Sequence, residues 1–81
     1  MNPSYVSALV GSGEAFLALE QSEEALASFE AALSADGSLI YLREAIEELG
    51  FTVIRQRLAA AAAAAEAGRY DEARSAYQRV L

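Results

Sequence analysis

Adjacent carboxylates occur at three places in the chain, and paired acids are side chains that acid–base catalysis or a divalent cation could use. The pairs are Glu23-Glu24, Glu47-Glu48 and Asp71-Glu72. Neighbouring residues on an α-helix point about 100° apart, so the two acids of a pair do not converge on one ligand. The first and third pairs stand where helices are expected to begin, and negative charge stabilises that end of a helix dipole. We therefore expect neither a catalytic site nor a metal site at these pairs.

Gly11-Ser12-Gly13 is the second candidate, because glycine-rich loops can cradle phosphates. No strand is expected before it and no Gly-Lys-Ser follows it, so close helix packing explains the glycines better. The chain has no His to activate Ser12, and it has no Cys for a disulfide or a zinc site. These absences predict a protein that is not an enzyme and needs no cofactor.

The net charge of −6 is unevenly distributed along the 81 residues. Residues 1–50 hold nine carboxylates against Arg43 alone, whereas residues 51–81 hold three carboxylates against five arginines. An acidic chain without a basic stripe is a poor ligand for nucleic acid, so no such partner is expected. The asymmetry could attract a second copy head to tail, or it could simply reflect solvated helix faces.

No segment has the character of a membrane span or a signal peptide. The region from Met1 to Leu19 lacks a basic start and is interrupted by Gly11 and Glu14. The apolar run Ala59–Ala65 has seven residues, far short of the roughly 20 that span a bilayer. We expect no membrane insertion and a cytoplasmic location.

Apolar residues recur at three- and four-residue steps, which predicts an all-α fold of antiparallel helix hairpins with about five helices. Ser22 and Ser38 are predicted N-caps, and a break is favoured at Gly50. The apolar phase also continues across Gly50, so one long bent helix is the alternative. The expected helices begin at Pro3, Ser22, Ser38, Phe51 and Asp71.

Two segments of the chain share a pattern. Residues 19–33 align with residues 67–81, which places five pairs of similar residues in register: Glu24 with Glu72, Ala25 with Ala73, Phe29 with Tyr77, Ala32 with Val80, and Leu33 with Leu81. This pattern resembles the second helix of a tetratricopeptide repeat (TPR), a helix–turn–helix unit of about 34 residues. In that family the small residues lie where the two helices of a hairpin touch.

The resemblance divides a single domain, residues 1–81, into a repeat-like part at 6–39, an extra helix at 38–50 and a second repeat-like part at 54–81. In the first part Gly13 matches the small residue of the first helix, and Phe16 and Leu17 match the bulky pair after it. Two residues depart from the family pattern, since Glu20 stands where Gly is usual and Gly37 where a turn Pro is usual. The second part matches well only in its last fifteen residues.

The resemblance implies a protein–protein interaction module, a scaffold in a longer repeat array, that binds a protein or peptide on its concave face. The matching positions there are Val10, Glu14, Arg55 and Leu58. Some TPR domains grip chaperone carboxylate tails with Lys, Arg and Asn, but only Arg55 suits that use here. Tyr5 and Tyr41 are further candidates for interface anchors.

A self-assembling structural protein that forms dimers or filaments is the alternative function. Its contacts would use apolar residues near the two ends of the chain, namely Val6, Leu9, Tyr77, Val80 and Leu81. A stacked repeat cannot bury its outer face alone, so a second copy could cover it. An unrelated alanine-rich helical bundle would also account for the composition, in which nineteen residues are Ala.

Overall fold

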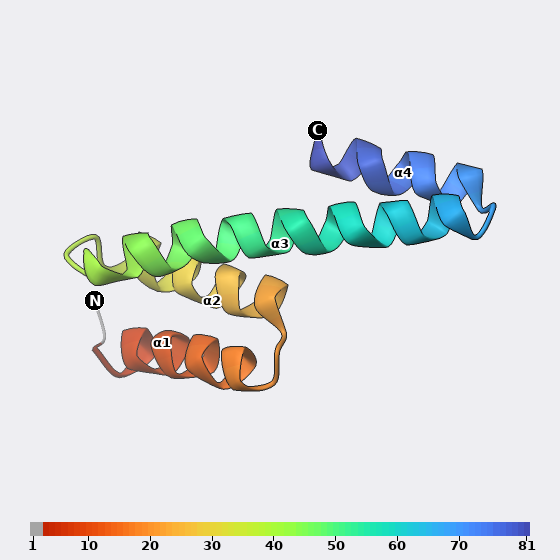
Figure 1. Ribbon diagram of the computed structural model, residues 1–81. Coiled ribbons are helices and arrows are strands. Elements are labelled where there is room, and N and C mark those ends of the chain that lie inside the picture. Colours follow the sequence, from red (N-terminus) through yellow and green to blue (C-terminus); the bar gives the residue numbers. More distant parts are fainter. Residues whose placement is uncertain (1–2) are drawn as a thin grey trace. The chain divides into compact units, whose positions relative to one another are not determined.

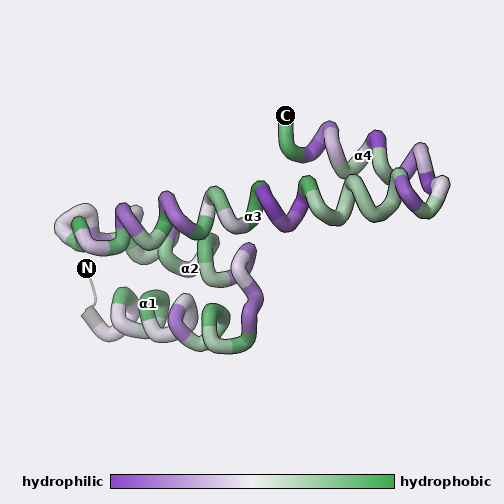
Figure 2. Tube along the Cα trace, viewed as in Figure 1, coloured by the Kyte–Doolittle hydropathy of each residue, from purple (hydrophilic) through white to green (hydrophobic). Residues whose placement is uncertain are grey.

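The computed structural model describes residues 3–81, which form four α-helices and no strand (Figure 1). The helices are α1 (Pro3–Ala18), α2 (Ser22–Ala35), α3 (Tyr41–Glu66) and α4 (Tyr70–Val80). The predicted all-α fold is confirmed. Short blocks of hydrophobic and hydrophilic residues alternate along the helices, as amphipathic packing requires (Figure 2).

The predicted break at Gly50 is wrong, because α3 passes through this residue without interruption. Gly50 lacks the positive φ that would mark a helix end, and the buried residues Leu42, Leu49 and Val53 keep one helical phase across it. A helix-interior Gly costs only about 1 kcal/mol relative to Ala, which the strong helix formers around it offset. The alternative of one long helix is therefore the observed one, and the described residues contain four helices instead of five.

The chain divides into two compact units, residues 1–50 and residues 51–81, and α3 contributes to both. In unit 1, α1 and α2 pack against each other as a hairpin, hereafter hairpin 1. The first part of α3 joins them through a shared cluster of buried side chains. This cluster consists of Ala25, Phe29, Ala32, Leu42 and Leu49.

Gly13 allows α2 to approach α1 closely. A β-carbon at Gly13 would lie 2.6 Å from Cε1 of Phe29, well inside van der Waals contact, whereas one at Gly11 would meet nothing within 4 Å. The expectation that Gly13 stands at a helix–helix contact is thus confirmed. The same expectation is wrong for Gly11, because no neighbouring helix approaches within 4 Å of a β-carbon there.

The turn of hairpin 1 is a Schellman motif. The N–H of Gln21 donates to the carbonyl of Phe16 at 2.8 Å, and the N–H of Glu20 donates to the carbonyl of Leu17 at 3.0 Å. Glu20 adopts φ +60°, a left-handed conformation that favours glycine. A conformation that usually requires Gly is therefore adopted here by a glutamate.

Neither predicted serine cap forms. Ser22 is the first residue of α2, its N-cap is Gln21, and no side chain caps that end. Ser38 instead turns back to Asp36, whose Oδ1 accepts hydrogen bonds from the Ser38 N–H at 3.0 Å and from its hydroxyl at 2.6 Å. This arrangement shapes the link between α2 and α3 and leaves α3 to begin at Tyr41, three residues later than expected.

Unit 2 contains the second part of α3, residues 51–66, and α4, which folds back along it (Figure 1). We call this pair hairpin 2. Its buried residues are Val53 and three alanines: Ala61, Ala64 and Ala73. The alanine run therefore allows close backbone packing, as the composition suggests.

Candidate functional site

The turn of hairpin 2 repeats that of hairpin 1. The N–H of Arg69 donates to the carbonyl of Ala64 at 2.9 Å, and the N–H of Gly68 donates to the carbonyl of Ala65 at 3.0 Å. Each of these residues stands 48 positions after its counterpart in the first turn. Gly68, the counterpart of Glu20, likewise has a positive φ of +80°. The two hairpins are thus built on one backbone plan.

The small residues at the helix contacts follow the same spacing. Ala25 and Ala73 are 0% and 4% exposed, and Gly13 has its counterpart in Ala61, which is fully buried. The sequence alignment of residues 19–33 with 67–81 therefore corresponds to equivalent positions in two similar hairpins. The equivalence also extends into the first helix of each hairpin, where the sequence similarity is weak.

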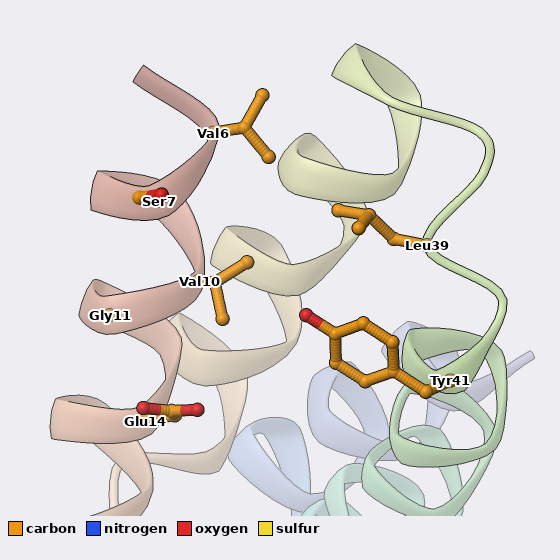
Figure 3. A pocket seen from close by; sticks show the side chains of 7 residues that line it. All are labelled: Val6, Ser7, Val10, Gly11, Glu14, Leu39 and Tyr41. Carbon is orange, nitrogen blue, oxygen red and sulfur yellow. The ribbon is translucent and has the colours of Figure 1, made fainter. Parts of the chain in front are cut away.

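An open groove of about 260 Å³ lies in unit 1, between α1 and the start of α3 (Figure 3). Conventional small-molecule sites enclose about 300–1,000 Å³ and cover most of their ligand, so this groove suits a few side chains of a larger partner better. Its lining residues come from α1 and from the segment at the start of α3: Val6, Ser7, Val10, Gly11, Glu14, Leu39 and Tyr41.

The groove combines apolar walls with a polar rim. Val6 and Val10 face Leu39 across it, and the ring of Tyr41 directs its hydroxyl toward α1 (Figure 3). Glu14 supplies the only charged side chain of the lining. The groove can therefore hold an apolar side chain and pair with a cationic group beside it.

The residues predicted for a partner-binding face do not form one described site. Val10 and Glu14 both line the groove in unit 1, whereas Arg55 and Leu58 belong to unit 2. Arg55 Nη2 donates to Thr52 Oγ1 at 3.3 Å, and Leu58 is 41% exposed. The groove adds Tyr41, a predicted interface anchor that is 63% exposed.

Sequence reasoning missed three of the groove residues, Ser7, Gly11 and Leu39, as members of a site. Ser7 lies three residues before Val10 and Gly11 lies three residues before Glu14 on the same helix, so helical spacing could have indicated them. Leu39 could not be found this way, because its place depends on how the Asp36–Ser38 turn returns the chain to α1.

The residues predicted for self-association differ widely in exposure. Val6 is buried and Leu9 is half-buried, so they offer little free surface. Tyr77 is 41% exposed, Leu81 is fully exposed, and Val80 is half-buried. A self-association surface would thus draw mainly on α4.

Two of the three carboxylate pairs lie at the beginning of a helix. Glu23 and Glu24 lie in the first turn of α2, and Asp71 and Glu72 lie in the first turn of α4. Asp71 and Glu72 also form exposed ion pairs with Arg74 and Arg69, at 3.6 and 3.3 Å. Within residues 3–81, no group of three or more acids is placed to hold a metal ion.

Hydrogen bonding perturbs one acid outside the groove. The hydroxyl and the N–H of Ser38 both donate to Asp36, and they lower the pKa of its carboxyl below the ordinary 3.8. Because both hydrogen bonds are exposed and join residues two positions apart, the shift reflects a local turn.

None of the helices in the described part of the chain combines the length and the apolar character that a bilayer crossing requires. No protein-family model, curated protein or solved structure matches this chain.

Proposed function

We propose that this chain is a protein–protein interaction module of the TPR type, which binds a peptide segment of another protein in the groove of unit 1. The observation that carries the proposal is the repetition of one hairpin plan, with its left-handed turn residue and its small contact residues, 48 positions apart. Repeated helix hairpins commonly serve as scaffolds for partner binding.

The groove defines the chemistry of the partner. Its apolar walls favour a branched aliphatic or aromatic side chain, and Glu14 favours an adjacent Arg or Lys. Nine carboxylates against one arginine in residues 1–50 also attract a basic segment over longer distances. The expected partner is therefore a peptide in which a basic residue stands next to an apolar anchor.

Peptide selection on the immobilised chain tests the proposal. Enriched peptides are expected to combine an apolar anchor with a basic neighbour and to bind at least about tenfold more weakly to Gly11→Gln, whose side chain fills the groove. Gly50→Gln is the matched control, since Gly50 also lies inside a helix with nothing within 4 Å of a new β-carbon and does not line the groove. Equal binding to both variants, or no enrichment at all, would refute the proposed groove.

A further inference from the structure

The two ends of the groove in unit 1 differ in chemistry. Val6, Val10 and Leu39 line its apolar end, and the carboxylate of Glu14 lies beyond Val10 along α1 (Figure 3). Val10 and Glu14 stand four residues apart, so they lie one above the other on the same face of the helix. A ligand that lies along this face therefore passes from an apolar surface to a negative charge.

The carboxylate of Glu14 is available to a ligand. The residue is exposed, and no side chain within residues 3–81 forms an ion pair or a hydrogen bond with this carboxylate. It can therefore accept hydrogen bonds from a cation of the partner without losing an internal contact. Hydrogen bonds between a cation and a carboxylate are about twice as strong as those between neutral groups.

Tyr41 supplies a second oxygen acceptor from the opposite wall. It is the first residue of α3, and its hydroxyl points across the groove toward α1 (Figure 3). Tyr41 is 63% exposed, so its hydroxyl proton can turn to water while the oxygen accepts a hydrogen bond from a ligand. The groove thus offers one oxygen acceptor on each of its two walls.

The α1 wall is open between Val10 and Glu14. A β-carbon at Gly11 would meet nothing within 4 Å. The aliphatic stem of a long basic side chain can therefore lie over the helix backbone at Gly11, while its charged end reaches the two acceptors.

Acceptors on two opposite walls distinguish arginine from lysine. A guanidinium carries five N–H donors on a planar fork, so it can pair with a carboxylate on one side and donate to a hydroxyl on the other. The ammonium of lysine is one compact, strongly hydrated centre, and a bond to Glu14 holds it against α1 with its other donors in water. A guanidinium is also more weakly hydrated, which suits a site beside apolar side chains.

We propose that Glu14 and Tyr41 form an arginine-selective subsite of the groove, in which the carboxylate pairs with the guanidinium and the hydroxyl oxygen accepts a further N–H. The inference rests on the function proposed above and specifies it, because it names arginine, and not lysine, as the basic residue of the partner. Tyr41 determines the selectivity, since the carboxylate of Glu14 attracts either cation.

Three tripeptides test the selectivity, with the full chain as the receptor. N-acetyl-Leu-Arg-Leu-amide places an apolar anchor on each side of the basic residue. Its two counterparts carry Lys or citrulline in the middle, and citrulline keeps the shape of arginine without its charge. NMR titration, followed at the Tyr41 ring and the Glu14 carboxyl group, gives the dissociation constants. We expect the Arg peptide to bind about fivefold more tightly than the Lys peptide, the effect of one additional hydrogen bond, and the citrulline peptide to bind most weakly.

Receptor variants assign the effect to the two acceptors. Tyr41→Phe keeps the ring and removes the hydroxyl, so it should lower the affinity for the Arg peptide about fivefold and leave that for the Lys peptide nearly unchanged. Glu14→Gln should weaken both charged peptides. Tyr5→Phe and Glu30→Gln are the matched controls, because both residues are exposed and neither lines the groove, and they should bind as the wild type does.

Equal affinity of the wild type for the Arg and Lys peptides, or an equal loss of both in Tyr41→Phe, overturns the subsite. Absence of saturable binding by all three tripeptides also overturns it. The groove itself is judged separately, because Gly11→Gln should block peptides selected on the immobilised chain whether their basic residue is Arg or Lys. Selected peptides that tolerate replacement of Arg by Lys would therefore support the groove and overturn the arginine subsite.

Discussion

The aromatic ring of Phe29 packs over Gly13. A β-carbon added at residue 13 would lie only 2.6 Å from Cε1 of this ring. Phe29 is only 3% exposed, so its ring has little room to move away. The contact joins α1 to α2 at the centre of hairpin 1, and it depends on the absence of a side chain at Gly13.

Gly13→Ala should therefore lower the free energy of unfolding by about 1–2 kcal/mol, because overpacking outweighs the better helix propensity of Ala. Gly11→Ala is the matched control in the same helix, where a β-carbon meets nothing within 4 Å, and it should raise stability by about 1 kcal/mol. Urea unfolding of both variants measures the difference. Similar effects at both positions would contradict the observed contact.

Ala25 should tolerate enlargement far less than Ala27 does. Ala25 is fully buried in the cluster with Phe29, whereas Ala27 is exposed on the same helix. Ala25→Leu is expected to cost on the order of 1–3 kcal/mol through overpacking, and Ala27→Leu should change stability little. Thermal unfolding followed by circular dichroism compares the two, and equal melting temperatures would show that the helix register is incorrect.

Glu20→Gly should stabilise the chain. Glu20 has φ +60°, and a left-handed conformation costs a non-glycine residue about 1–2 kcal/mol. Replacement by Gly removes this cost, but Gly also has more conformational freedom in the unfolded chain, which offsets part of the gain. A net gain of about 0.5–1 kcal/mol in unfolding free energy is expected. The reciprocal variant Gly68→Ala should lose about 1 kcal/mol, since Gly68 holds φ +80° at the equivalent turn. A loss of stability in Glu20→Gly would argue against the shared turn conformation.

The link between α2 and α3 should show a pH dependence at Asp36. Hydrogen bonds from the hydroxyl and the N–H of Ser38 lower its pKa in the folded chain, so the ionised acid stabilises the turn above pH 3.8. This contribution should be lost as the pH falls below 3.8 through the folded pKa. NMR titration of the Asp36 carboxyl carbon should give a pKa below 3.8 in the wild type and a higher one in Ser38→Ala. An identical pKa in both proteins would show that the hydroxyl hydrogen bond does not form in solution.

Local patterns were sufficient for most of the secondary structure. Apolar residues at helical spacing indicated an all-α chain, and the acids at the start of α2 and α4 indicated where these helices begin. The same patterns predicted the contact at Gly13, because only a residue without a side chain fits between helices that touch there. They failed at Gly50, since glycine propensity suggested a break where the continuous apolar phase maintains α3.

The repetition at 48 residues was strong in the sequence only in the second helix of each hairpin. In the first helices the small residues Gly13 and Ala61 correspond and both are buried, but Ala64 and Ala65 replace the bulky Phe16 and Leu17, so the sequence match is weak there. Each turn is defined by two backbone hydrogen bonds and by one residue with a positive φ. Glu20 is that residue in the first turn and Gly68 in the second. A backbone conformation of this kind can persist without a matching residue type.

The sequence by itself determined the helical class of this protein, its charge asymmetry and the small residues on which its hairpins close, because these depend on composition and on spacing along one helix. Only the tertiary structure decided where Leu39 and Tyr41 meet α1 to complete the groove. This property depends on how the turn at Asp36 and Ser38 directs the chain. Such contacts between distant residues leave no periodic trace in the sequence.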